Sequence, residues 1–149
     1  MKEISRITVS VGHTEKARGA INEKCFIQEY SLNMIVSHLL TSSLAKHGLF
    51  PALIENERIF TKAKLINAGK DDFIIEVHHN AFDKKAKGFL FMYKENDEIG
   101  YTVGTQIDKM ITHTNVREPI CVRSTRDNYL IFSCNIPCII IECCFIDNF

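Results

Sequence analysis

The sequence predicts an α/β domain built on a single, mostly parallel, twisted sheet with helices on both faces. Short apolar runs of strand length alternate along the chain with longer stretches whose apolar residues recur at helical spacing. This alternation is typical of βαβ units, in which a crossover helix joins two parallel strands. A length of 149 residues and a hydrophobic content of 46% predict one compact domain over residues 1–149.

The N-terminal part predicts a strand followed by a helix. Residues 6–11, RITVSV, alternate apolar and polar side chains and are rich in β-branched residues, so we expect a strand that ends at Gly12 and His13. From about residue 27 to 47, apolar side chains recur at helical spacing, which predicts the first helix. Gly48 follows directly and is typical of a helix C-terminus.

The middle of the chain predicts three strands and a second helix. Residues 51–55 form a short strand, and residues 57–68 place their apolar side chains on one helical face. The run FIIEVHHNA (73–81) begins with continuous apolar residues, as expected of a parallel strand that is covered on both faces. The run GFLFMYK (88–94) predicts a strand nearer the sheet edge.

The C-terminal part predicts one more helix and one more strand. Apolar residues fall four apart between positions 99 and 111, which predicts a third helix. CIIIECCF (138–145) predicts a buried strand that carries one carboxylate, Glu142.

Charge and cysteine content narrow the classes of function. The 18 Lys and Arg residues balance 18 Asp and Glu residues, so no broad field attracts nucleic acid or an anionic membrane, and we expect no nucleic-acid partner. The six cysteines are not spaced as a disulfide framework, since Cys143 and Cys144 are adjacent, and we expect reduced thiols. The first residues show neither a secretory signal nor a membrane span, which predicts a cytosolic protein.

Polar residues gather where three predicted strands end. Residues 12–13, residues 78–80 and Glu142 all fall at such ends, and the functional crevice of an open α/β sheet lies outside the C-terminal ends of its strands. Because side chains alternate along a strand, only one of His78 and His79 can face that crevice. Glu76 and Asn80 share the face of His78.

Two imidazoles and one carboxylate would make a zinc site of the catalytic type, with a position left for water. His13 and His78 offer the imidazoles, and Glu29, at the start of the first long helix, is the candidate carboxylate. Glu142 could then take a proton from the water as a general base.

Each of these residues also has a purely structural interpretation. Glu29 could serve only the helix dipole, and His13 could only satisfy a loop backbone. Glu142 could make a structural hydrogen bond, although a carboxylate in an apolar strand is costly unless it is paired or protonated, which favours a function. A rival metal site of Cys134, Cys138, Cys143 and Cys144 lacks the usual paired spacing, so these four are interpreted as small buried hydrophobic residues.

Four motifs in order resemble the zinc-dependent N-acetylmuramoyl-L-alanine amidases of type 3, especially the catalytic domains of bacteriophage endolysins. They are ITVSVGH, QEYSLN, IIEVHHNA with a following KGF, and CIIIECCFIDN, and together they extend from Ile7 to Asn148. The resemblance implies hydrolysis, in bacterial peptidoglycan, of the amide between N-acetylmuramic acid and the L-alanine of the stem peptide. It also implies cell-wall degradation and cytolysis as the biological outcome.

The resemblance assigns the site residues one by one. It implies that His13, Glu29 and His78 bind one zinc ion per chain. Glu142 is implied to be the catalytic general base and acid. His79 falls on a variable position of the family's His-x-Asn-Ala motif, where it faces away or contacts substrate, and Asn80 is the motif's Asn.

The chain departs from the family pattern at three places. Glu76 stands where many members have Ser, and it could orient His78 from behind the metal. Lys62 stands where an Arg is common. Members usually continue with another helix, whereas this chain stops at Phe149, so we expect one under-covered sheet face, with truncation, dimerisation and another source of stability as open alternatives.

Other functions remain open from the sequence alone. They are a zinc carboxypeptidase or another zinc amidohydrolase acting on a different peptide bond, an inactive wall-binding module, and a domain without metal. The expected location, the cytosol of the producing cell, fits a lysis protein that reaches the wall after release. The sequence leaves the stem-peptide preference and the oligomeric state open.

Overall fold

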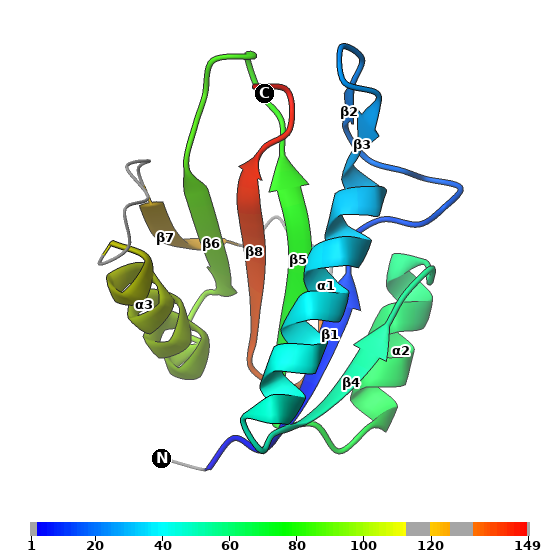
Figure 1. Ribbon diagram of the computed structural model, residues 1–149. Coiled ribbons are helices and arrows are strands. Elements are labelled where there is room, and N and C mark those ends of the chain that lie inside the picture. Colours follow the sequence, from blue (N-terminus) through cyan, green and yellow to red (C-terminus); the bar gives the residue numbers. More distant parts are fainter. Residues whose placement is uncertain (1–2, 113–119, 126–132, 149) are drawn as a thin grey trace.

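The computed structural model describes residues 3–112, 120–125 and 133–148 (Figure 1). Its elements in chain order are β1 (Arg6–Val11), β2 (Ile21–Asn22), β3 (Ile27–Gln28), α1 (Glu29–Lys46), β4 (Phe50–Ile54), α2 (Ile59–Ala68), β5 (Phe73–Asn80), β6 (Phe89–Lys94), α3 (Glu98–Thr112), β7 (Ile120–Thr125) and β8 (Cys138–Phe145). Within the described residues, no helix combines the length and the apolar character needed to cross a bilayer.

Six strands form one twisted sheet in the order β4-β1-β5-β8-β6-β7 (Figure 1). The strands β4, β1, β5 and β8 run parallel, β6 is antiparallel to β8, and β7 is parallel to β6. The predicted mostly parallel sheet is confirmed. The strand β6 lies next to the edge strand β7, in agreement with its predicted place near an edge.

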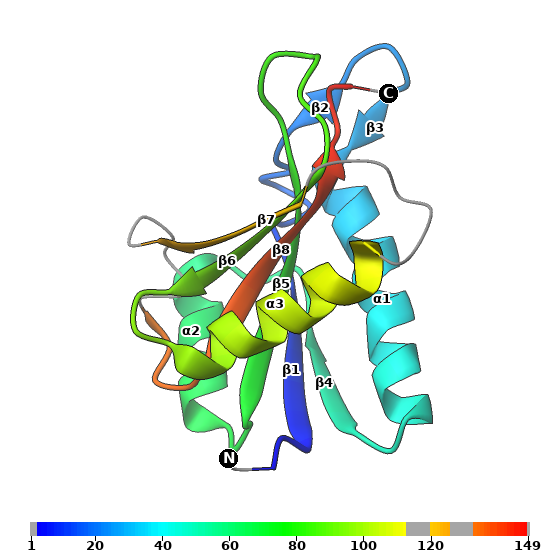
Figure 2. The same cartoon turned by 90° about the vertical axis from the view of Figure 1, so that its left-hand side faces the viewer.

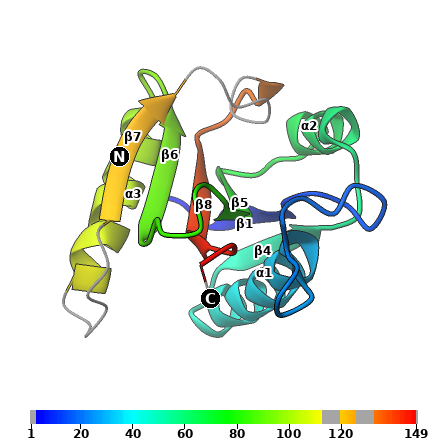
Figure 3. The ribbon, with the colours of Figure 1, turned by 90° about the horizontal axis from the view of Figure 1, so that it is seen from above.

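Helices cover both faces of the sheet, as predicted. Figures 2 and 3 show α1 and α3 on one face and α2 on the other. Side chains at odd positions of β5 and β8, such as Ile75 and Ile139, join the core cluster against which α1 and α3 pack. Side chains at even positions, such as Ile74 and Ile140, face α2. The apolar continuity of β5 and β8 therefore reflects burial on both faces.

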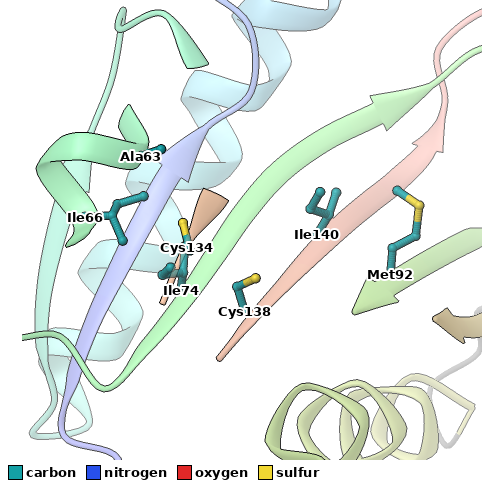
Figure 4. Close-up of a cluster of buried hydrophobic side chains, with 7 residues drawn as sticks. All are labelled: Ala63, Ile66, Ile74, Met92, Cys134, Cys138 and Ile140. Atoms are coloured by element: carbon teal, nitrogen blue, oxygen red, sulfur yellow. The ribbon is translucent and has the colours of Figure 1, made fainter. Parts of the chain in front are cut away.

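The core under α2 is small and includes two free thiols (Figure 4). Cys134 and Cys138 are buried in it beside Ile66, Ile74 and Ile140. All five cysteines whose side chains are described are free, as expected, but Cys143 and Cys144 are only half-buried, because the sheet is less completely covered near the end of β8.

Two small features differ from the sequence expectations. The helix predicted from about residue 27 begins at Glu29, because Ile27–Gln28 pairs as β3 with β2 in a short hairpin. The strand β7 (Ile120–Thr125) was not predicted, since its polar second half carries little of the apolar signal of a strand; it is held by pairing along β6.

The two ends of the described chain lie at opposite ends of the parallel strands (Figure 1). The chain enters beside the start of β1, and residues 146–148 follow the C-terminal end of β8. On the face shared by α1 and α3, Ile141 and Cys143 of β8 are half-buried, so the cover of this face is incomplete among the described residues.

Candidate active site

The candidate residues meet at the C-terminal edge of the parallel strands. His13 follows β1, and Glu29 is the first residue of α1. His78 lies in β5 and pairs in register with Glu142 of β8. The sheet order makes β1, β5 and β8 neighbours, which brings together side chains that are far apart in the sequence.

Glu29 bridges the two histidines through its two carboxylate oxygens. Its Oε2 lies 3.0 Å from Nε2 of His13, and its Oε1 lies 3.0 Å from Nδ1 of His78. The two imidazole rings stand edge to face with their centroids 5.0 Å apart. One ligand atom from each residue lies within 4.8 Å of the other two, and this donor set suits zinc. No second group of His, Cys, Asp or Glu gathers this closely in the described part of the chain.

Backbone donors hold the Glu29 carboxylate in place. The N–H of Ala20 donates to Oε2 at 2.9 Å, and the N–H of His79 donates to Oε1 at 3.2 Å. Burial alone would raise the pKa of Glu29, but the hydrogen bonds from His13, His78 and Ala20 outweigh it and hold the pKa well below its usual value. Glu29 is therefore an anion at neutral pH.

His78 lies between carboxylates. Burial alone would lower its pKa, but the hydrogen bond to Glu29 and the negative charge of Glu76 outweigh burial and raise the pKa to about 10. The Nε2 atom lies 3.8 Å from Oε2 of Glu76, which is an ion-pair distance. A metal ion at this site would replace the proton on Nδ1 and meet a site that already carries negative charge.

Glu142 has an unused oxygen. Its side chain is half-buried, and its Oε2 atom is enclosed without a hydrogen-bond partner within the described structure. Burial raises the pKa of Glu142, and the opposing effect of the charge on His78 only partly offsets this. An enclosed carboxylate with a raised pKa and a free acceptor is suited to take up a proton.

His79 faces away from the site, toward α1. Its Nδ1 lies 2.7 Å from Oδ1 of Asn33, and the Asn33 amide donates to the carbonyl of Gly12 at 3.1 Å. Burial lowers the pKa of His79, so the ring is neutral at pH 7. This chain of contacts fixes the backbone that precedes His13. Asn80 Oδ1 accepts a local hydrogen bond from the Ala81 N–H.

Lys62 is a buried residue whose role was missed in the sequence. Its ammonium donates to Oε1 of Glu76 at 3.2 Å and also to the carbonyl of Val11. The hydroxyl of Ser10 donates to the same Oε1 at 3.2 Å. The sequence gives no sign that a lysine in a helix is buried. The contacts of Lys62 with Glu76 and Val11 become visible only when α2 is placed against β1 and β5.

Gly12 allows the close approach of β1 and β5. A Cβ atom at this position would lie 2.5 Å from the carbonyl oxygen of Val77 and 2.6 Å from the ring of His78. We therefore expect Gly12→Ala to lower the free energy of unfolding by roughly 1–3 kcal/mol, measured by denaturant titration. In Gly48→Ala the added methyl meets no atom within 4 Å, but Gly48 has a φ of +80°, so the loss in that variant reports left-handed backbone strain, which does not apply at Gly12. A Gly12→Ala variant as stable as the wild type would contradict the steric argument.

An open pocket of about 500 Å³ adjoins the site on the α2 side of the sheet. His13, Glu76 and His78 form its inner wall, and Arg58 and Ile59 at the start of α2 are part of its outer wall. A chain segment of a polymer could therefore reach the two histidines from solvent.

A parallel sheet with two imidazoles and a bridging carboxylate at its C-terminal edge, and a second carboxylate beside them, is typical of metal-dependent hydrolases. The comparisons with known proteins agree with this class. Residues 7–149 match the N-acetylmuramoyl-L-alanine amidase family, type 3. The chain belongs to this family, and it is an amidase.

Solved structures share the fold. The chain superposes on the N-acetylmuramoyl-L-alanine amidase AmiC2 of Nostoc punctiforme with a TM-score of 0.82 at 15% identity, covering 97% of this chain and 81% of that one. For an N-acetylmuramoyl-L-alanine amidase from Clostridium difficile 630 the TM-score is 0.81 at 21% identity, covering 99% of this chain and 83% of that one. For the catalytic domain of the CD27L endolysin, which targets Clostridia difficile, the TM-score is 0.80 at 23% identity, covering 97% of this chain and 83% of that one. No curated protein sequence matches the chain.

Proposed function

We propose that this amidase uses one zinc ion, held by His13, Glu29 and His78, to cleave the bond between N-acetylmuramic acid and the L-alanine of the stem peptide in bacterial peptidoglycan. The observation that carries the proposal is the bridging of two imidazoles by Glu29 beside Glu142, whose Oε2 has no hydrogen-bond partner among the described residues. Membership of the amidase family supports the choice of bond.

The residues of the chain divide the chemistry between them. Bound at this site, zinc supplies a Lewis acid for the scissile carbonyl and lowers the pKa of water to roughly 7. Glu142 takes the proton of the attacking water on its free oxygen and passes it to the leaving amine of L-alanine. Burial raises the pKa of Glu142, which favours its uptake of the proton that it then passes on.

The backbone around the site keeps the ligands in position. The N–H groups of Ala20 and His79 orient the two oxygens of Glu29, so that each faces one imidazole. Asn33 links the ring of His79 to the carbonyl of Gly12, which precedes His13. The site is therefore built on strand ends and a helix start rather than on side chains free to rotate.

Metal content tests the proposed site. We expect about one zinc per chain by elemental analysis of the purified protein, and loss of that zinc in His78→Ala, because one of three protein ligands is removed. His47→Ala, which removes an exposed histidine at the end of α1, should keep its zinc. A wild-type protein that stays free of metal when zinc is supplied would disprove the metal site.

Product analysis tests the proposed bond. Digestion of purified peptidoglycan should free the amino group of L-alanine, which amino-group labelling and mass spectrometry would identify. New carboxyl ends within the stem peptide would instead point to a zinc carboxypeptidase or another amidohydrolase. Binding to the wall without any new ends would indicate an inactive wall-binding module.

We also propose that the protein is an endolysin of a bacteriophage, made in the cytosol of the producing cell and acting on the wall after release. The endolysin catalytic domain with the same fold supports this, as do the five free thiols of the described chain, which suit a reducing compartment. Processed, exported protein in intact cells would contradict the proposal.

A further inference from the structure

A buried ion pair lies directly behind the candidate metal site. The side chains of Lys62 and Glu76 are each 3% exposed, and Nζ of Lys62 lies 3.2 Å from Oε1 of Glu76. Two opposite charges enclosed in a protein are costly to desolvate, and replacing such a pair by apolar residues is often neutral or stabilising. The pair therefore calls for an explanation beyond stability.

The ion pair connects the two segments that carry the histidine ligands. Glu76 lies two residues before His78 on β5, and Val11 lies two residues before His13 at the end of β1. The ammonium of Lys62 donates both to Glu76 and to the carbonyl of Val11, so one side chain from α2 holds both segments. Their separation depends in part on this contact.

The carboxylate of Glu76 has one oxygen for the ion pair and one for His78. Both donors, Lys62 and the hydroxyl of Ser10, use Oε1. The other oxygen, Oε2, lies 3.8 Å from Nε2 of His78. A carboxylate accepts hydrogen bonds and does not donate them, so its charge favours the proton on Nε2. The opposite nitrogen, Nδ1, lies 3.0 Å from Oε1 of Glu29, and a metal ion that replaces the proton on Nδ1 would find its lone pair directed into the site.

We propose that Lys62 and Glu76 are positioning residues for the metal: the pair holds the ligand segments of β1 and β5 together, and Glu76, which faces Nε2, orients the ring of His78 so that Nδ1 points to the metal. The inference rests on the proposed zinc function. It differs from the ligand set itself, because neither residue belongs to the group of three that could touch the metal. Partners behind a metal ligand typically change metal affinity by about 10–100-fold when they are mutated.

Glu76→Gln is the decisive variant. The amide oxygen would take the place of Oε1 beside Lys62 and Ser10, so the amide nitrogen would point at Nε2 of His78. An N–H donor there favours the proton on Nδ1, which competes with the metal. We expect zinc affinity, measured by competition with a chromophoric chelator, to fall by about 10–100-fold. Lys62→Arg keeps the charge and the donors and should retain most of the affinity.

Thr8→Val is the matched control for a structural effect. It removes another hydrogen bond of β1, from the buried Thr8 hydroxyl to the half-buried Asp71 at 2.6 Å, which does not involve Glu76. We expect it to lower the melting temperature of the metal-free protein and to leave zinc affinity unchanged. In the zinc-loaded wild type, long-range ¹H–¹⁵N spectra should show the proton of His78 on Nε2.

The outcomes separate this inference from the zinc function. A wild-type protein without zinc affinity would overturn both. Unchanged affinity in a folded Glu76→Gln variant, with only the melting temperature affected, would overturn the inference and leave the zinc function standing. A proton on Nδ1 of His78 in the zinc-loaded wild type would do the same. If Glu76→Gln does not fold, the neutral pair Lys62→Met with Glu76→Gln takes its place, and wild-type affinity in that variant would also overturn the inference.

Discussion

Replacement of Glu142 by Gln is expected to lower the rate of amide hydrolysis by about 10²–10⁴-fold, because the amide side chain cannot take the proton of the attacking water. The rate would be measured as release of L-alanine amino groups from purified peptidoglycan. Zinc content should stay at the wild-type level, since Glu142 lies outside the three-residue group that could hold the metal.

The same substitution should stabilise the metal-free protein. In the wild type, the Oε2 atom of Glu142 is enclosed by the protein and has no hydrogen-bond partner within the described structure. Ionisation of this carboxyl group therefore opposes folding. We expect Glu142→Gln to raise the free energy of unfolding at neutral pH by on the order of 1 kcal/mol, or Tm by about 2–4 °C.

The extra stability of Glu142→Gln over the wild type should increase as the pH rises. Folding raises the pKa of Glu142 above its ordinary value of 4.5, so ionisation of Glu142 destabilises the folded wild type at pH values above 4.5. Below pH 4.5 the wild-type carboxyl is protonated in both the folded and the unfolded protein, and the advantage of Gln should disappear. Glu98→Gln, at an exposed carboxylate of α3, is the control and should show neither effect. Full activity in Glu142→Gln would refute its role as the general base.

Replacement of Glu29 by Gln is expected to abolish zinc binding and to destabilise the metal-free protein by about 3 kcal/mol, which corresponds to roughly 6–12 °C in Tm. Glu29 is buried and makes charge-assisted contacts with His13 and His78, so the neutral amide would leave His78 without its closest counter-charge. Thermal unfolding with chelator present measures the effect without the metal.

The pH dependence of the metal-free protein tests the same contacts. The pKa of Glu29 is lowered by folding, so its contribution is present above pH 4.5 and is lost as the pH falls below that value. The pKa of His78 is raised to about 10, so its contribution is complete below its ordinary value of 6.5 and is lost as the pH rises toward 10. We expect the metal-free protein to be most stable between pH 4.5 and pH 6.5, where both contributions are complete. The profile of stability against pH should be flatter in Glu29→Gln. Identical profiles would show that these ion pairs do not contribute.

The parallel core of the fold was predictable because its signal is local. The strands β1, β5 and β8 carry apolar runs that are recognisable one at a time, and each ends in the polar residues that later meet at the site. The rule that crevices form at strand ends predicts from the sequence that His13, His78 and Glu142 lie at one edge of the sheet. Their side-chain chemistry already suggested two imidazole ligands and a general base, and the resemblance implied the same roles.

What could not be predicted depends on partners distant in the sequence. The short hairpin of β2 and β3 and the strand β7 exist because of pairing, and their own residues give little preference for a strand. The burial of Lys62 follows from where α2 lies on the sheet, and a solvated helical lysine would look the same in the sequence. The contact between His79 and Asn33 likewise appears only when α1 is placed over β5.

The opposite placement of the two ends of the chain decides where an attachment would interfere with the enzyme. A fluorescent label, a surface tether or a wall-targeting module joined at the N-terminal end would emerge near the start of β1, at the opposite end of that strand from His13 (Figure 1). The same addition at the C-terminal end would emerge just beyond β8, the strand that carries Glu142. Fusions of this amidase should therefore be built on its N-terminal side, and the length of any C-terminal linker would control access of the substrate.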